Sequence, residues 1–211
     1  MNSLFLGSSS ESRKYLLNES KIPFEVIAHT ACEEDVPLRE TLEETVQDIA
    51  RYKMAHLVLP AGKEGQKAFV LTADSMGVDD QGVMYGKPRD KAHAIEMLKK
   101  LTGPEKFLKT ATGFCLEYRV CIEGQWITQE RIERVVTAHY EFVIPDQWIV
   151  PYIENSCALK ASGSIAVEWY GLQFLKRING SYSAVMGLPM FELREALELL
   201  GFFDTYTQKR V

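Results

Sequence analysis

The stretch Ser3-Leu4-Phe5-Leu6-Gly7-Ser8-Ser9-Ser10 joins a short apolar run to a loop of glycine and serine. Its first four residues predict a strand, and a helix is expected to follow over about Glu11–Glu19. Ser8-x-x-Glu11 matches a capping box, a pattern found where helices begin. Pro23 then ends the helix, and Phe24–Ala28 is typical of a second strand. A strand, a helix and a strand therefore follow one another at the N-terminus.

The remaining sequence mixes helices with extended segments. Thr41-x-x-Glu44 is another capping box, and the helix that it starts is expected to end by Pro60. Ala68–Thr72 is typical of a buried strand that ends on Ala73-Asp74-Ser75. The later elements expected are a helix after Asp90, strands over about Phe107–Arg119, Val120–Thr128 and Arg131–Val143, a helix near Asp146–Glu154, a strand over Leu172–Ile178 and a helix over Pro189–Leu200. This pattern predicts an α/β or α+β fold with long antiparallel strands.

The composition is that of a soluble globular protein with an acidic balance. Of the 211 residues, 46% are hydrophobic and 25% are charged. The 29 Asp and Glu residues exceed the 24 Lys and Arg residues, and the formal net charge is −5. This balance argues against a nucleic-acid partner, because nucleic-acid binding depends on clustered cations. A small polyanionic substrate remains compatible with the balance if a few cations converge locally.

The cysteine, histidine and hydropathy patterns argue against several kinds of site. The four cysteines form no C-x-x-C pair and the four histidines lack metal-ligand spacing, so neither a zinc site nor a disulfide framework is expected. No apolar run reaches about 18 residues, so we expect no membrane span. The start of the chain lacks the features of a secretory signal, and the expected location is the cytoplasm.

Two loops have the residue types that bind phosphate or metal. Gly7-Ser8-Ser9-Ser10 offers backbone N–H groups and hydroxyls at a helix start, and Arg13 follows one turn later, which suits a phosphate. A serine cap without a ligand is the alternative. Glu33-Glu34-Asp35 offers three consecutive carboxylates, which could hold a divalent cation, supply a base or simply be solvated.

Two further places carry a carboxylate and a group of cations. Asp74 follows an apolar strand, a position that suits a metal ligand or a base, or a turn-forming residue. Gly86-Lys87-Pro88-Arg89 is a rigid turn with two cations, and Lys53 lies on the preceding long helix. Carboxylates for a metal, cations for phosphates and a serine-rich helix start together favour metal-assisted attack on a phosphate ester. The sequence contains no G-x-S-x-G, Walker A or G-x-G-x-x-G motif.

These four places, in this order and at these spacings, resemble motifs of the Maf family of nucleotide pyrophosphatases. The resemblance covers nearly the whole chain. It rests on Leu6-Gly7-Ser8-Ser9-Ser10-Glu11-Ser12-Arg13 for L-A-S-x-S-P-x-R, Phe24-Glu25-Val26 with the acidic loop, Lys53-Met54-Ala55 for K-A-x-A, Thr72-Ala73-Asp74-Ser75, Gly86-Lys87-Pro88 and Gly187-Leu188-Pro189. Any one of these motifs is weak, whereas six in register are specific.

The resemblance implies a single Maf-like domain over residues 1–211, with a Maf/ITPase-like α/β fold, a mixed sheet and two lobes around a central cleft. A homodimer is also implied as the assembly. The implied reaction hydrolyses a nucleoside triphosphate to the monophosphate and pyrophosphate with Mg²⁺, Mn²⁺ or another divalent cation. By matching position, Asp74 and Glu33 would be the catalytic and metal-binding carboxylates. The implied phosphate-binding residues are Ser8, Ser10, Arg13, Lys53 and Lys87.

A later segment bears on which base is recognised. Gly163, Ser164 and Glu168 resemble the 7-methyl-GTP subgroup more than the dTTP/UTP subgroup. A glutamate can accept hydrogen bonds from the N1–H and the exocyclic amine of guanine. We therefore expect 7-methyl-GTP as the substrate, with dTTP or UTP as the alternative. Trp169 departs from this pattern, because it replaces the glycine that usually follows.

Three departures from the family pattern keep a second hypothesis open. Glu11 and Ser12 replace the usual Pro-Arg, which puts a carboxylate beside the phosphate loop and removes a cation, and Ala184 stands where many members carry Asn. The second hypothesis is a diverged member, linked to cell division, that binds a nucleotide or a protein without turnover. Aromatic residues that could stack on a base, although core packing is their more common role, are Trp126, Trp148, Tyr170 and Phe174.

Overall fold

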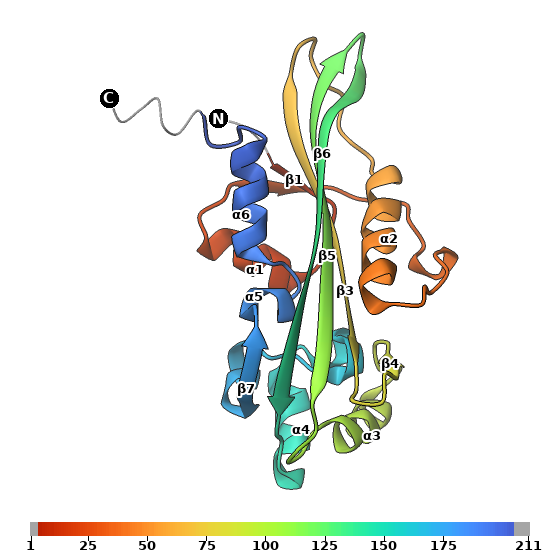
Figure 1. Cartoon of the computed structure of the whole chain (residues 1–211), viewed down its shortest axis with the longest axis vertical. Helices are drawn as coiled ribbons and strands as arrows, with labels where there is room; N and C mark the ends of the chain where they lie inside the picture. The colour runs from red at the N-terminus through yellow and green to blue at the C-terminus, as the bar shows by residue number, and fades with distance from the viewer. Residues whose placement is uncertain (1–3, 205–211) are drawn as a thin grey trace.

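The structure is a computed structural model that describes residues 4–204, and it consists of one mixed sheet with helices on both faces and at one end (Figure 1). The strands are β1 (Leu4–Leu6), β2 (Phe24–Val26), β3 (Lys67–Val78), β4 (Met84–Tyr85), β5 (Leu108–Ile122), β6 (Gln125–Phe142) and β7 (Leu175–Gly180). The α-helices are α1 (Glu11–Glu19), α2 (Leu42–Ala55), α3 (Lys91–Leu101), α4 (Asp146–Asn155), α5 (Tyr182–Val185) and α6 (Met190–Leu199). The short 3-10 segments are η1 (Glu33–Asp35), η2 (Ala158–Lys160), η3 (Ser162–Ser164) and η4 (Trp169–Phe174).

The sheet has the strand order β2-β1-β3-β5-β6-β7, and β4 pairs with β3 outside this path. Strand β1 is parallel to both β2 and β3, whereas β3, β5, β6 and β7 pair antiparallel. The expected α/β fold with a mixed sheet and long antiparallel strands is thereby confirmed. Figure 1 shows that β3, β5 and β6 run along the longest axis of the molecule.

The strand boundaries differ from expectation in the centre of the sheet. The three strands expected over residues 107–143 are two, because β5 and β6 turn only once, at Glu123-Gly124. Glu123 and Gly124 have φ values of 51° and 76°, as a two-residue hairpin turn of type I′ requires. Strand β3 does not end at Asp74 but continues to Val78, because β5 pairs with it along its whole length. Cross-strand pairing of this kind leaves no signal in either segment alone.

Strand β7 is shifted from the expected range, because Trp169–Phe174 forms η4, so the strand begins at Leu175 and continues past Ile178 to Gly180. The helices agree more closely with expectation. Thr41 caps α2 by accepting a hydrogen bond from the Glu44 amide, which confirms the capping box. Among residues 4–204, no helix is long and apolar enough to cross a bilayer.

Two apolar layers pack on opposite faces of the N-terminal half of the sheet. Side chains alternate along each strand, so Leu4 and Leu6 of β1 pack with α1 and α6, whereas Phe5 packs with α2. Each of these side chains is almost fully buried, and burying a residue of this size stabilises the fold by about 1.5–3 kcal/mol. A third apolar cluster at the other end of the long strands joins α3, α4 and η4 around Phe142 and Tyr152. The middle of β3 therefore lies between these packing regions.

Candidate active site

Three charged side chains that are distant in sequence meet beside the middle of β3. The Lys53 ammonium on α2 lies 2.7 Å from Asp74 Oδ1 and 2.7 Å from Glu33 Oε1. Lys53 is 4% exposed and Asp74 is 6% exposed, whereas the Glu33 side chain is about half exposed. The structure thus brings together three of the predicted site residues, with the cation between the two carboxylates.

The alternation of β3 distributes its side chains between two helices. Asp74 faces α2, and the next residue, Ser75, faces α1, where it accepts a hydrogen bond from Arg13 Nη2 at 3.2 Å. The buried Arg13 guanidinium also donates to Ser8 Oγ at 3.0 Å and, through Nε, to the Gly187 carbonyl at 2.8 Å. Arg13 is therefore fixed by three elements of the chain at once.

The loop before α1 is held by its own serines. Ser10 is the N-cap of α1 and accepts from the Arg13 amide at 3.5 Å, so the expectation that Ser8 caps this helix is wrong. Ser8 Oγ instead accepts from the Ser10 amide at 3.3 Å and from Arg13. This arrangement points the positive end of α1 and the loop amides toward one region, as in many phosphate sites.

The two carboxyls have pKa values shifted in opposite directions: the pKa of Asp74 is raised and that of Glu33 is lowered. Burial raises the pKa of Asp74, although the positive charges of Lys53 and Arg13 oppose this shift. Burial alone would also raise the pKa of Glu33, but Lys53, with smaller contributions from Lys87 and Arg13, brings it below its usual range. A carboxylate with a raised pKa accepts protons more readily, so Asp74 suits a base better than Glu33 does.

Lys87 approaches the same cluster from the turn at Gly86-Lys87-Pro88. Its side chain is exposed, and it forms none of the hydrogen bonds or ion pairs found among residues 4–204, although its charge acts on Glu33. The Gly86 carbonyl accepts a hydrogen bond from the Gly163 amide at 2.9 Å. The cationic turn is thereby tied to the segment that the sequence associates with base recognition.

The predicted base-specificity residues have different surroundings. Ser164 is fully buried, and its hydroxyl donates to Met97 Sδ at 3.7 Å, toward α3. Glu168 is 6% exposed and accepts a hydrogen bond from Ser12 on α1 at 2.5 Å. Within this predicted trio, Glu168 is the residue that contacts the helix carrying Arg13.

Several residues of this region escaped the sequence analysis. Thr112 Oγ1 on β5 lies 2.8 Å from Ser75 Oγ and 2.7 Å from the Ala184 carbonyl. Its place follows from the pairing of Ser75 with Thr112, which no local pattern reveals. His29 lies near the cluster as well, and burial, followed by the charge of Lys53, lowers the pKa of its imidazole. Ser75 could have been found, because it directly follows Asp74.

The carboxylates fit a divalent cation that phosphate oxygens would help to hold. Glu33 and Asp74 already share one cation, the Lys53 ammonium, so their oxygens converge on a common region. No group of three or more His, Cys, Asp or Glu side chains within residues 4–204 is arranged to hold a metal. Mg²⁺ is commonly held by one or two carboxylates together with substrate phosphates, and this donor set suits that mode.

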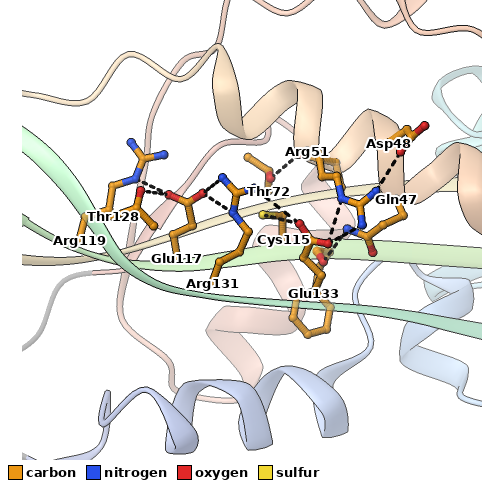
Figure 2. A network of polar contacts seen from close by, with 12 residues as sticks. Gln47, Asp48, Arg51, Thr72, Cys115, Glu117, Arg119, Thr128, Arg131 and Glu133 are labelled. Carbon is orange, nitrogen blue, oxygen red and sulfur yellow. Dashed lines mark hydrogen bonds and ion pairs between the residues drawn. The ribbon is translucent and has the colours of Figure 1, made fainter.

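A separate polar network joins side chains of β5, β6 and α2 (Figure 2). Its centre is the fully buried Glu117, whose oxygens accept from Arg119, Thr128 and Arg131 at 2.6–2.8 Å. Beside it, Arg51 of α2 pairs with Glu133 on β6 (Figure 2). The charges of this network are paired with one another, which suits a structural role better than anion binding.

Comparisons with known proteins identify the family. The model of a family described as "Maf-like protein" matches residues 3–200. The chain is 33% identical to the dTTP/UTP pyrophosphatase of Ruminiclostridium cellulolyticum, over 95% of this chain and 97% of that protein. It is 32% identical to the dTTP/UTP pyrophosphatase of Escherichia coli K12, over 100% and 98% of the two chains. A solved HAM1 protein from Coxiella burnetii has 17% identity and a TM-score of 0.35, covering 67% of this chain and 73% of that one.

These relatives confirm the expected family and its class, nucleotide pyrophosphatases, whereas their names give no support to the expected preference for 7-methyl-GTP. The match covers the chain from the serine loop before α1 through α6. The chain therefore belongs to the Maf family.

Proposed function

We propose that this chain hydrolyses a nucleoside triphosphate to the monophosphate and pyrophosphate. The observation that carries the proposal is the cluster of Lys53, Asp74 and Glu33 beside the buried Arg13. A triphosphate needs several cations around it, and its hydrolysis needs a carboxylate that can take a proton from water. The cluster has both in one place, and it lies in a chain whose full-length relatives carry pyrophosphatase names.

In this mechanism Arg13 and Lys87 bind phosphate oxygens, and the amides at the start of α1 add hydrogen bonds. Asp74 takes a proton from the water that attacks the α-phosphorus, the bond to the bridging oxygen breaks, and pyrophosphate leaves. Lys53 holds Asp74 in place and offsets charge on the leaving group. A divalent cation bound to Glu33 and Asp74 would neutralise phosphate charge and polarise the phosphoryl group. Attack at the α-phosphorus is inferred from the family.

The departure at Glu11 does not oppose this mechanism. Its carboxylate is exposed and pairs with Lys14 at 2.5 Å, so solvent and a counter-charge both weaken its repulsion of a phosphate. Ala184 contributes its backbone carbonyl to the contact with Thr112, a role that does not depend on its side chain. A diverged member without turnover is therefore the weaker hypothesis.

We propose dTTP or UTP as the preferred nucleotide, because relatives that align over the whole chain carry that name. The second candidate is 7-methyl-GTP, favoured by Glu168, whose buried carboxylate suits a base that donates N–H groups. A homodimer and a single domain over residues 1–211 stay predictions of the family resemblance.

Pyrophosphate release from dTTP, UTP, CTP, GTP and 7-methyl-GTP, with Mg²⁺, Mn²⁺ or EDTA, tests the proposal. We expect turnover with a divalent cation and a loss of at least about 100-fold in Asp74→Asn, the usual contribution of a general base. Asp80→Asn, a change at an exposed carboxylate, is the matched control and should keep wild-type rates. No turnover of any triphosphate would refute the proposal, and nucleotide binding without turnover would favour the diverged member.

A further inference from the structure

Two side-chain contacts join α1 to the start of η4. Ser12 Oγ donates to Glu168 Oε1 at 2.5 Å, and the Tyr15 ring meets the Trp169 ring edge-on, with centroids 5.4 Å apart and planes at 75°. Ser12 and Tyr15 are three residues apart and share one face of α1. Glu168 and Trp169 are consecutive, so both contacts fix the same short segment.

The Trp169 backbone is strained, and core packing does not account for it. Its φ is +51°, a left-handed conformation that bulky residues rarely adopt. Trp169 is nevertheless 41% exposed and Tyr15 is 40% exposed, so two large aromatic residues are partly open to solvent beside a buried carboxylate. Strain of this kind persists where surrounding contacts enforce it and is concentrated at ligand sites.

Glu168 retains the capacity to accept further hydrogen bonds. Ser12 occupies Oε1, and none of the ion pairs found among residues 4–204 includes Glu168, although the residue is 6% exposed. A buried carboxylate without a cation is costly unless donors approach it. A carboxylate only accepts, so the group that satisfies it must carry N–H or O–H donors.

The contact between Ser12 and Glu168 lies next to Arg13, which is proposed to bind the phosphates of a nucleotide. Ser12 precedes Arg13, whose guanidinium belongs to the charged cluster around Ser75. One turn of α1 therefore carries both a phosphate-binding cation and the contact to Glu168. Ser12 and Arg13 are neighbours in the chain, so a nucleotide whose phosphates lie at Arg13 can extend its base past Ser12 toward Glu168.

We propose that Ser12 is a positioning residue that holds Glu168 for the N–H donors of the base, and that Tyr15 and Trp169 form the surface against which the base packs. The proposal rests on the proposed function and names its substrate class, a base with a protonated ring nitrogen, such as uracil, thymine or guanine. Cytosine carries a hydrogen-bond acceptor at the corresponding ring nitrogen, so it could not donate to the carboxylate and its lone pair would be repelled by it. Packing of a base on an aromatic side chain is worth about 1–3 kcal/mol in other proteins.

The hydroxyl of Ser12 is tested by comparing Ser12→Ala with Ser12→Thr. We expect Ser12→Ala to raise KM for UTP about tenfold, the effect of one lost hydrogen bond to a charge, with kcat within about twofold of wild type. The preference for UTP over CTP should fall by a similar factor, and Ser12→Thr should restore both. Inhibition by inorganic tripolyphosphate, which has no base, should not change. An unchanged KM and an unchanged UTP/CTP preference would overturn the role of Ser12.

The aromatic surface is tested by fluorescence, which does not require turnover. The chain has three tryptophans, and UTP without a divalent cation should quench the emission of the wild type and of Trp148→Phe. Trp169→Phe should lose this quenching, and tripolyphosphate should cause none. Trp169→Gly should weaken the UTP/CTP preference without lowering Tm, since glycine accepts the positive φ. Equal quenching in Trp169→Phe and the wild type would overturn the aromatic surface, whereas no turnover of any triphosphate refutes only the proposed function.

Discussion

The Lys53 ammonium and the Asp74 carboxylate lie 2.7 Å apart, and both residues are more than nine-tenths buried. Separately, each charge would be costly in this environment, because burial removes the water that solvates it. Together with the half-exposed Glu33 they form a group in which two negative charges face one positive charge. The charge of the buried Arg13 also acts on both carboxylates, so two negative charges and two positive charges meet in this part of the molecule.

We expect Lys53→Met to reduce both activity and stability. Removing the ammonium leaves the buried Asp74 carboxylate without its hydrogen-bond partner, and breaking a buried pair in this way costs about 3–5 kcal/mol. The free energy of unfolding from urea titrations measures this loss, and pyrophosphate release measures the loss of activity. Lys63→Met, which changes an exposed lysine, should leave both unchanged. A Lys53→Met protein as stable as the wild type would contradict this account of the pair.

Arg13→Lys should reduce kcat/KM by at least about 100-fold, because lysine cannot reproduce a planar fork that donates in three directions. The guanidinium reaches Ser8, Ser75 and the Gly187 carbonyl, and a lysine ammonium reaches at most a part of this set. Steady-state kinetics measure the change. Arg194→Lys, on the exposed face of α6, is the control and should retain activity. Retained activity in Arg13→Lys would show that positive charge alone suffices at this position.

The Glu117 network should make stability depend on pH. Burial would raise the pKa of Glu117, but the hydrogen bond from Thr128, the charge and hydrogen bond of Arg119 and the hydrogen bond from Arg131 bring it below its usual range. A depressed pKa contributes stability that is present above the unfolded pKa and is lost as the pH falls through the folded pKa. The difference in Tm between the wild type and Glu117→Gln should therefore be largest near pH 6 and shrink below about pH 4.5.

The exposed Glu130 is the matched control for this experiment. Glu130→Gln should follow the wild-type Tm across the whole pH range, because Glu130 takes part in none of the ion pairs found among residues 4–204. Thermal unfolding followed by circular dichroism supplies the Tm values. A constant difference between the wild type and Glu117→Gln at all pH values would show that the ionisation of Glu117 does not contribute.

The hairpin between β5 and β6 offers two substitutions with opposite expected signs. Gly124→Ala places a Cβ at a φ of 76° and should lower the free energy of unfolding by about 1 kcal/mol. Glu123→Asn should raise it, since Asn-Gly is the favoured pair in a type I′ turn. Urea unfolding of both variants measures the two changes. Equal effects of the same sign would mean that this turn does not limit stability.

Local patterns in the sequence indicate much of the candidate site, because its charged and hydroxyl residues lie in short motifs. Arg13, Glu33, Lys53, Asp74 and Lys87 each lie in a recognisable segment, and the structure brings them into one neighbourhood. Helix starts were readable for the same reason, since Thr41 and Asp90 cap α2 and α3 through contacts only three residues away. Information of this kind is contained within one turn of a helix.

Features that depend on pairing between distant segments were not readable. The continuation of β3 past Asp74 depends on β5, and the contact of Thr112 with Ser75 depends on the register of the two strands. The contact between Ser12 and Glu168 spans 156 positions, and nothing in either segment identifies the other. Ser10 caps the helix, whereas the Ser8 hydroxyl accepts a hydrogen bond from Arg13, and the local sequence does not distinguish these two roles.

The placement of Asp74 and Ser75 on opposite faces of β3 limits which genetic changes the protein can tolerate. A substitution in the preceding strand residues alters one side chain and leaves the others in place. Deletion of a single codon between Phe69 and Ala73 would instead turn every following side chain to the other face of the sheet. Asp74 would then point toward α1 and Ser75 toward Lys53, so the carboxylate proposed as the base and its lysine would be separated. The number of residues in β3 before Asp74 therefore matters to function as much as the identity of those residues.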